Sequence, residues 1–154
     1  PDGRYIIGRG ADRKSDPDHV IAKLAVIDVS SHQIVTTSDI PDVYISKYYF
    51  NPEGTRLYLT TSSKGSPEQV ANLKDDVMLV FDMTVLPEIK LIAEIAIGAS
   101  GSLSFLNNNG TTELIFSSDS SAGAVVVIDG VNHIVLQSLP VGDATVQSRA
   151  WLLG

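Results

Sequence analysis

An apolar run closed by an aspartate occurs three times in this chain and marks an internal repeat. The copies are residues 25–28 (AVID), 79–82 (LVFD) and 126–129 (VVID), so the matching aspartates lie 54 and then 47 residues apart. Each copy is followed by a short polar turn and a second apolar run, and each is preceded by a turn and a strand-like segment. A repeat of this length with four short strands is typical of a β-propeller blade rather than of a helical repeat.

The local pattern within each repeat also indicates strands. In 56–61 (RLYLTT), Leu57, Leu59 and Thr61 alternate with Tyr58 and Thr60, which places the two sets on opposite faces of a strand. The other apolar runs are rich in β-branched or aromatic residues, which favour strands. The strongest helical candidate is the short stretch 67–74, which we place in a loop. We expect the aromatic cluster of Tyr44, Tyr48, Tyr49 and Phe50 to be mostly core. The sequence therefore predicts an all-β fold.

We name the four strands of a blade a, b, c and d, from the inside of the propeller outward. The predicted strands are 45–50, 102–106 and 147–153 for strand a, 5–8, 56–61 and 113–117 for strand b, 24–29, 77–83 and 124–129 for strand c, and 33–40, 89–97 and 134–141 for strand d. The first two a–b connections read Pro-Asp-Gly and Pro-Glu-Gly. In such a turn, proline suits the second position and glycine supplies a positive φ.

In this scheme the whole chain, 1–154, is a single partial β-propeller that is permuted by one strand. Strands b to d of the first blade occupy 1–43, the second blade 44–100, the third blade 101–145, and strand a of a following blade 146–154. Three blades are too few to close a ring, which needs about four to eight. Either the chain is part of a longer propeller, which we favour, or a second copy closes a six-bladed ring by exchange of the last strand.

The turns and the strand-c runs resemble those of a known repeat family. Residues 1–6 (PDGRYI), 51–60 (NPEGTRLYLT) and 125–129 (VVVID) resemble YVTN-type β-propeller repeats. They are similar in style to the heavy or β subunits of quinoprotein amine dehydrogenases, and to bacterial surface-layer and periplasmic propellers. The third repeat departs from the pattern, with Asn-Asn-Asn-Gly at 107–110. WD-repeat propellers match less well, because the chain has no Gly-His or Trp-Asp pair.

This resemblance covers essentially the whole chain, but it is specific for the fold only, because such repeats serve scaffolds, binders and enzymes alike. We favour a non-catalytic scaffold or binding module, since the residues show no catalytic constellation, and we expect no cofactor in this chain. The alternative is the propeller subunit of a periplasmic oxidoreductase whose partner chain carries the cofactor. Whether the chain belongs to an enzyme is left open. The resemblance implies a periplasmic or extracellular location.

Composition excludes several other classes of protein. The chain has 11 basic and 18 acidic residues, a net charge of −7, which argues against a nucleic-acid partner. The absence of cysteine excludes a disulfide framework, a thiolate zinc site and cysteine catalysis. No apolar run is long enough for a membrane-spanning helix, and no secretion signal opens the sequence.

The candidate binding residues gather on one face of the predicted propeller. The b–c and d–a loops emerge together around the mouth of the central channel, and two predicted b–c loops, 9–22 and 62–76, are long enough to indicate a function. We predict that this face contacts a protein or a small ligand. Two cations on inner strands are expected to line the channel and to suit an anion. The candidates are Arg9, Asp12, Lys14, Asp16, His19, Lys47, Lys64 and Arg149.

The first of these loops also offers ligand types that a hard cation prefers. Asp12, Asp16, Asp18 and His19 supply carboxylates and one imidazole. Their spacing lacks the glycine and the closing glutamate of an EF-hand, and neighbouring cations such as Arg13 neutralise the cluster. We therefore interpret the cluster as a solvated, salt-bridged loop, and we predict no metal site.

Two sets of repeated polar residues are expected to be structural. Asp28, Asp82 and Asp129 each end a predicted strand c, where a carboxylate accepts hydrogen bonds from the backbone of a turn. His32 and His133 each lie four residues after such an aspartate. The matching offsets indicate a turn preference rather than a catalytic pair, because the two histidines belong to different blades.

Overall fold

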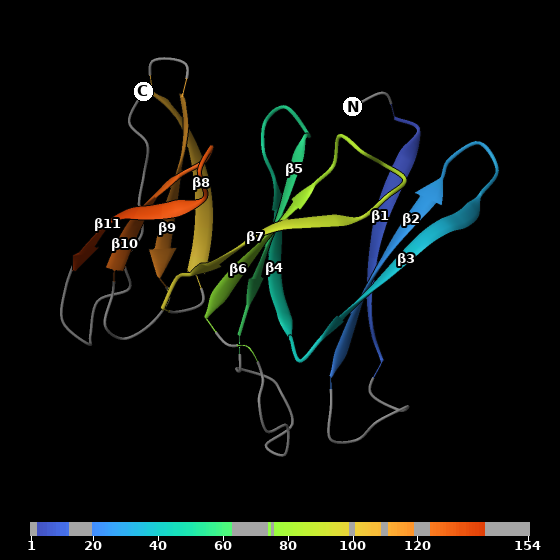
Figure 1. Ribbon diagram of the computed structural model, residues 1–154, viewed down its shortest axis with the longest axis horizontal. Helices are drawn as coiled ribbons and strands as arrows, with labels where there is room; N and C mark the ends of the chain where they lie inside the picture. The colour runs from blue at the N-terminus through green and yellow to red at the C-terminus, as the bar shows by residue number, and fades with distance from the viewer. Residues whose placement is uncertain are drawn as a thin grey trace.

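The computed structural model describes residues 3–12, 20–62, 74, 76–98, 101–108, 111–118 and 124–140, and these residues form three antiparallel sheets (Figure 1). Strands that follow one another in sequence pair within each sheet. The described part holds no helix with the length and apolar character that a membrane crossing requires. The strands are β1 (Tyr5–Asp12), β2 (Ile21–Asp28) and β3 (Gln33–Pro41) in the first sheet, β4 (Ile45–Phe50), β5 (Arg56–Thr61), β6 (Val77–Asp82) and β7 (Lys90–Ala96) in the second, and β8 (Gly101–Asn108), β9 (Thr111–Ser118), β10 (Ala124–Asp129) and β11 (Ile134–Pro140) in the third.

Most strands lie where the repeat predicts them. β4, β5 and β10 have the predicted bounds. The largest difference is in β1, which continues to Asp12 instead of ending at Gly8, and its last residue pairs with Ile21 of β2. The predicted loop 9–22 is therefore too long at both ends, because the hairpin continues beyond the glycines of β1. The predicted strand at 147–153 lies outside the described residues.

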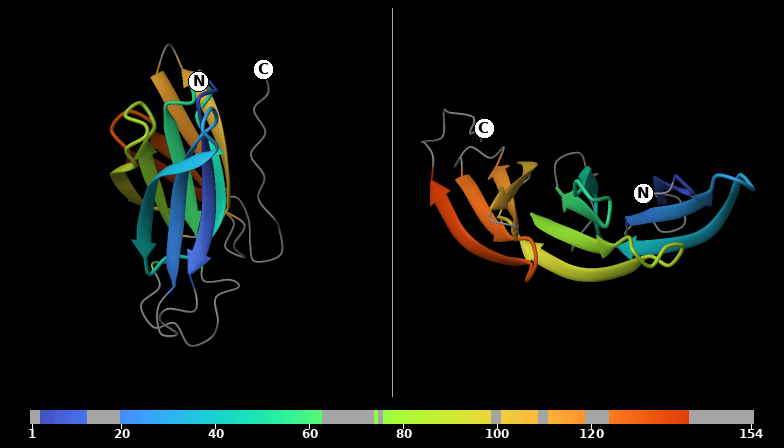
Figure 2. Two further views of the ribbon diagram at one scale, coloured as in Figure 1. Left: turned by 90° about the vertical axis from the view of Figure 1, so that its right-hand side faces the viewer. Right: turned by 90° about the horizontal axis from the view of Figure 1, so that it is seen from above.

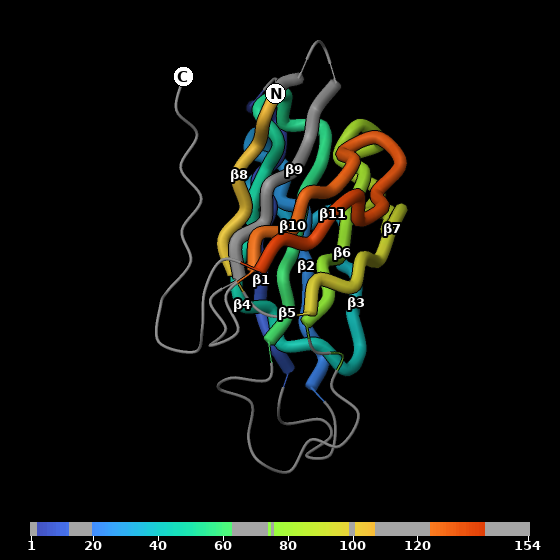
Figure 3. The backbone as a smooth tube through the Cα atoms, turned by 90° about the vertical axis from the view of Figure 1, so that its left-hand side faces the viewer, coloured from blue at the N-terminus to red at the C-terminus, as the bar shows by residue number. Residues whose placement is uncertain are grey.

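The three sheets stand side by side and fan out in an arc (Figure 2). Seen from above, β3, β7 and β11 lie along the convex side, whereas β1, β4 and β8 lie along the concave side. Figure 3 views the arc from the end of the third sheet and shows β8 at one margin and β11 toward the other. Neighbouring propeller blades have this radial arrangement, with their first strands toward a shared axis.

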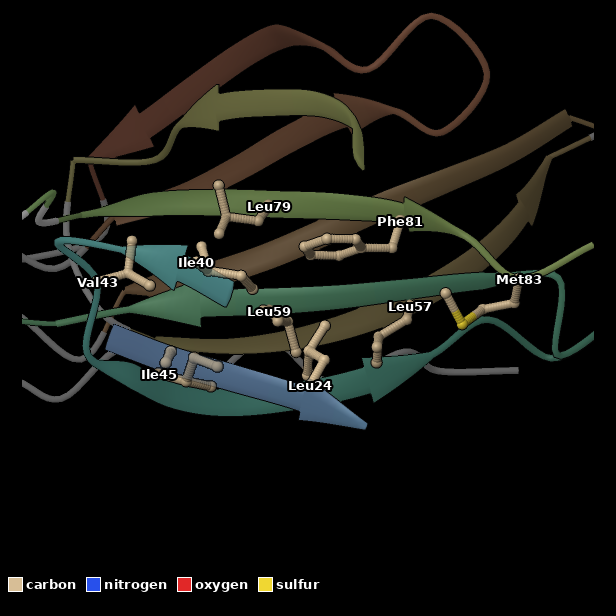
Figure 4. Packing of buried hydrophobic residues seen from close by; sticks show 10 residues of the cluster. Leu24, Ile40, Val43, Ile45, Leu57, Leu59, Leu79, Phe81 and Met83 are labelled. Carbon is tan, nitrogen blue, oxygen red and sulfur yellow. The ribbon is translucent and has the colours of Figure 1, made fainter. Parts of the chain in front are cut away.

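Two apolar clusters join the sheets. One cluster lies between the first and second sheets and includes Leu24 and Phe81 (Figure 4). The other lies between the second and third sheets and includes Tyr58 and Val126. The second sheet is thus covered on both faces, so β5 and β6 are buried at successive positions, whereas β2 alternates between buried and half-buried residues.

Each sheet has a β-bulge at the same place, in the hairpin formed by its last two strands. The register shifts lie between Val26 and Ile27, between Val80 and Phe81, and between Val127 and Ile128. An extra residue at such a position raises the local twist and bends the strand that carries it. The outermost strands β3, β7 and β11 are therefore all paired across a bulge.

The a–b turn of the second sheet confirms the predicted role of its glycine. Gly54 has a φ of 68° and donates its N–H to the carbonyl oxygen of Asn51 at 2.9 Å. The Asn51 side-chain oxygen accepts the N–H of Arg56 at 2.8 Å, which closes the turn from inside. Gly3, at the matching position of the first sheet, has a φ of 71°. Only glycine adopts this conformation without strain from a Cβ atom.

Candidate functional site

A cavity of about 280 Å³ opens between the first and second sheets. Its walls come from the end of β1, the start of β2 and the connection between β3 and β4. These segments adjoin the b–c and d–a connections, the face on which the sequence predicts a binding site. The residues that give the cavity its chemistry are Arg9, Val20, Ala22, Val43, Tyr44 and Ile45.

Arg9 is the cation of this cavity and is held by the second sheet. One guanidinium nitrogen donates a hydrogen bond to the carbonyl oxygen of Ile45 at 3.1 Å. The guanidinium carbon also lies 5.4 Å from the ring centroid of Tyr48, within the range of a cation–π interaction. Both contacts join β1 to β4. They orient the guanidinium before any ligand binds.

A second, more apolar cavity of about 200 Å³ follows β1 away from the first. Arg9 lines both cavities, and Ile7, Tyr48, Phe50 and Leu59 line the second. The side chains of Tyr48 and Phe50 are 56% and 44% exposed. The expectation that this aromatic run is mostly core is therefore wrong for these two residues. No strand among the described residues covers them on the inner side of β1.

The equivalent position between the second and third sheets is filled. Leu103 of β8 is 7% exposed, and Phe105 packs against Tyr58 with ring centroids 5.6 Å apart. Tyr49 of β4 joins the same cluster, and its hydroxyl lies 3.5 Å from the carbonyl oxygen of Gly101. Strand β4 thus covers the inner end of this interface.

A third cavity, of about 270 Å³, lies on the outer side of the first interface. The Nζ atom of Lys74 is 2.8 Å from a carboxylate oxygen of Glu94 at its rim, and the floor includes Leu79 and Phe81. Two charges of this rim therefore pair with each other, and a third, Asp39, pairs with Lys23. The part of the chain that the structure describes contains no cluster of three histidine or acidic side chains that could hold a metal ion.

The strand-c aspartates lie at the opposite ends of the sheets, in the c–d turns. Asp28 accepts the N–H groups of Ser30 and Ser31 at 2.9 and 3.0 Å. Asp82 and Asp129 accept equivalent N–H bonds in their own turns. The hydroxyl of Ser30, followed by the N–H of Ser31, lowers the pKa of Asp28 from 3.8 to about 2. The predicted structural role of these carboxylates is confirmed.

The two histidines complete the same turns. His32 and His133 have φ values of 56° and 57°, and each donates its backbone N–H to the carbonyl oxygen of its strand-c aspartate at 2.9 Å. Burial, with a smaller effect of the nearby Arg56 charge, lowers the pKa of His133. The prediction of a shared turn role is confirmed, because the two residues hold matching positions in different sheets.

The structure separates the candidate binding residues that it describes. Arg9 lines the cavities and Asp12 ends β1, so both belong to a strand rather than to a loop. Lys47 belongs to the other interface, where its Nζ donates to the Ser102 hydroxyl at 3.3 Å. The remaining candidates lie outside the described residues and stay predictions: Lys14, Asp16, His19, Lys64 and Arg149.

Sequence reasoning missed the non-charged part of the site. Val43 and Tyr44 line the larger cavity, and Tyr48 and Phe50 line the smaller one. The aromatic run was a visible signal. However, the exposure of these residues depends on which segment covers the inner side of β1, and the local sequence does not predict that contact.

Solved structures with a similar fold include β-propellers. A dihydro-heme d1 dehydrogenase, NirN, in complex with DHE has 13% identity and a TM-score of 0.54, covering 78% of this chain and 25% of its own. The β-propeller domain of Cps50 (Swd1) from Myceliophteria thermophila has 12% identity and a TM-score of 0.55, covering 92% and 43%. A candidate 6-phosphogluconolactonase from Bacteroides fragilis has 14% identity and a TM-score of 0.51, covering 93% and 45%.

These similarities confirm the predicted fold class: the chain is all-β and has the fold of part of a β-propeller. It spans a quarter to just under half of the length of these three chains. At such low identity the similarity shows the fold alone, and propellers serve varied functions. No family model matches the sequence, and no curated protein matches it either.

Proposed function

We propose that this chain is a non-catalytic binding module of a β-propeller and that its cavity beside Arg9 binds a small ligand with a carboxylate and an apolar body. The observation that carries the proposal is an oriented guanidinium next to an apolar wall. Val20, Ala22 and Val43 line the cavity but are each at most 2% exposed. The surface offered to a ligand therefore comes mainly from the exposed Ala11 and the half-buried Tyr44. A guanidinium has five N–H donors in a planar fork, which suits a carboxylate.

The position of the titratable groups favours binding over catalysis. The described carboxylates and the histidine with lowered pKa values lie in the c–d turns, at the far ends of the strands from the cavity. A general acid or base must lie within hydrogen-bond reach of the reacting group. The groups that line the cavity are instead a permanent cation, a tyrosine and aliphatic side chains.

A titration with a matched pair of probes tests the proposal. Hexanoate is added to isotopically labelled protein and the amide NMR spectrum is followed, with hexanol as the neutral probe of the same chain length. We expect hexanoate to shift the signals of Gly10, Ala11 and Tyr44, and Arg9→Gln to weaken its binding about tenfold or more, since a hydrogen bond to a charged group contributes about 1.5–3 kcal/mol.

Arg4→Gln is the control variant, because Arg4 stacks on Tyr5 with its guanidinium carbon 5.0 Å from the ring centroid, at the other end of β1. Hexanoate binding is expected to survive this change. Equal binding of hexanol, or shifts that centre on other residues, contradicts the proposal.

The second candidate function is the propeller subunit of a periplasmic oxidoreductase whose cofactor is carried by a partner chain. It is favoured by the resemblance of residues 51–60 to YVTN-type repeats of amine dehydrogenase subunits. A visible cofactor absorbance in the native complex, absent from the isolated chain, distinguishes it from the binding module. This assignment includes a periplasmic or extracellular location, which fractionation of the source cells tests.

Either function involves the blades that complete the ring. The remaining blades come from further residues of a longer propeller or from a second copy of the chain. Light scattering of the purified chain separates these two sources, because a strict monomer excludes the second copy.

A further inference from the structure

We propose that His133 makes a proton-sensitive contact between the second and third sheets, and that the c–d turn of the third sheet separates from the second sheet when the imidazole takes up a proton. This inference goes beyond the proposed function. It concerns the second interface, both of whose sheets the structure describes from the inner strand to the outer strand. Ligand binding beside Arg9 belongs to the first interface.

The first observation is that the backbone around His133 is fixed. His133 donates its N–H to the carbonyl oxygen of Asp129 at 2.9 Å and has a φ of 57°. The Asp129 carboxylate also accepts the N–H groups of Val131 and Asn132, at 2.7 and 2.9 Å. These bonds close the turn between β10 and β11. A displacement of the His133 backbone therefore moves the turn as a unit.

The second observation concerns one ring nitrogen of His133. Its Nε2 atom is buried and makes no hydrogen bond with any residue that the structure describes. A neutral imidazole has one donor and one acceptor nitrogen, whereas a protonated imidazole has two donors and a positive charge. Protonation therefore places a charged N–H group at a buried position without an acceptor, which is unfavourable until water reaches it.

The third observation is a permanent cation of the second sheet near this ring. Arg56, the first residue of β5, donates from one guanidinium nitrogen to the Asp82 carboxylate at 2.7 Å and to the carbonyl oxygen of Thr55 at 2.9 Å. Burial, followed by the charge of Arg56, lowers the pKa of His133. Protonated His133 and Arg56 therefore repel each other across the two sheets.

The other charged groups at this end of the interface do not reverse that balance. Asp129 opposes the lowering of the pKa of His133, but burial and Arg56 outweigh it. Asp82 already accepts hydrogen bonds from Arg56 and from Thr84. In the strand registers, Lys90 of β7 pairs with Asp82, and Glu113 of β9 pairs with Asp129.

The two interfaces differ in what the c–d connection contributes. The connection of the second sheet supplies Leu86 and Ile89, which pack against the apolar cluster of the first interface and carry no titratable group. The turn of the third sheet supplies His133 instead. The inner end of the second interface is held separately by Tyr58 and Phe105, whose ring centroids lie 5.6 Å apart. Protonation is therefore expected to open the second interface at its c–d end alone.

Hydrogen exchange combined with an NMR titration of the imidazole tests the inference. The closed interface binds the proton less readily than the open one, so opening increases as the pH falls below the ordinary pKa of 6.5. Between pH 7.5 and pH 5, we expect the amides of β11 to lose protection in step with the His133 ring signal, after correction for intrinsic exchange. The hairpin of β2 and β3 is expected to keep its protection. A ring that titrates while β11 keeps its protection, or an equal loss in both hairpins, overturns the proposal.

Two matched variants test the assignment to His133. His133→Asn removes the titrating ring and keeps a residue that accepts a positive φ, so the protection of β11 is expected to become independent of pH over this range. His32→Asn is the control, because His32 holds the same turn position in the first sheet. The control is expected to lose protection in β11 as the unchanged chain does. A loss that persists in His133→Asn overturns the proposal.

A second pair of variants tests the contact across the sheets and does not change the turn. Arg56→Gln removes the neighbouring charge, so the titration midpoint of the His133 ring is expected to rise and β11 to lose less protection at pH 5. Arg4→Gln is the control, because Arg4 forms the corresponding ion pair with Asp28 in the first sheet, at 3.5 Å. It is expected to leave both readouts unchanged. An unchanged midpoint in Arg56→Gln, with the chain folded by circular dichroism, overturns the proposal.

Discussion

The two inter-sheet interfaces differ at their inner ends. Between the second and third sheets, Phe105 packs on Tyr58 and Leu103 is almost fully buried. Between the first and second sheets, Phe50 and Tyr48 occupy the same register positions but remain exposed beside a cavity. The apolar cluster of an interface therefore does not bury its inner end by itself. The inner strand of the preceding sheet does so.

The largest expected effect tests whether the first interface is well packed away from its open end. Phe81 is 2% exposed within the cluster of that interface. Phe81→Ala is expected to lower the free energy of unfolding by about 3–5 kcal/mol, because it removes apolar surface that folding buries and leaves a cavity in the core. Urea unfolding measures the change. Leu91→Ala, at an exposed position of the same sheet, is the control and should change stability by about 0.5 kcal/mol or less.

The next prediction compares the equivalent aromatic residues directly. Phe105→Ala is expected to cost about 2 kcal/mol, less than a fully buried phenylalanine, since Phe105 is only partly buried against Tyr58. Phe50→Ala is expected to cost less than about 1 kcal/mol in dilute protein, because its ring is 44% exposed. Equal losses of stability in Phe105→Ala and Phe50→Ala would contradict the difference in packing between the two interfaces.

A smaller effect concerns the turn of the first sheet at acidic pH. The pKa of Asp28 is about 2 in the folded chain, below its ordinary value of 3.8, so the folded state binds fewer protons than the unfolded state in that range. Its stabilisation is present above about pH 4 and is lost as the pH falls toward 2. Asp28→Asn should therefore lower the melting temperature at pH 5 and reduce the melting-temperature difference between pH 5 and pH 2.5. An unchanged difference would contradict this role.

The smallest expected effect lies in the matching turn of the third sheet. The pKa of His133 is lowered from 6.5, so the unfolded chain gains a proton more readily as the pH falls below that value. Stability should decrease from pH 7.5 to 5.5, and His133→Asn should reduce this decrease because asparagine does not titrate. Asparagine also tolerates the φ of 57° at this position. His32→Asn is the matched turn variant in the first sheet. A decrease that His133→Asn leaves unaltered would assign the effect to another group.

The repeat made the fold predictable, because a period with four apolar runs specifies the number and order of strands. The repeated aspartates predicted their own turns for the same reason: Asp28, Asp82 and Asp129 each act on backbone groups within three residues. Of the charged candidate residues that the structure describes, only Arg9 lines the cavity. Its other residues come from the β3–β4 connection, and the contact of Arg9 with Ile45 spans 36 residues. Such contacts depend on how two sheets stack, which local patterns do not specify.

The repeated bulge has a consequence for how this chain aggregates. Bulges beside β3, β7 and β11 twist the outer margins of the sheets, and a twisted margin is a poor template for stacking flat strands into fibrils. β1 has no register shift in its pairing with β2 and keeps a straight ladder over its whole length. β8 likewise pairs with β9 without a register shift, so the regular ladders lie on the inner side of the sheets, and flat stacking of strands is disfavoured at the outer margins.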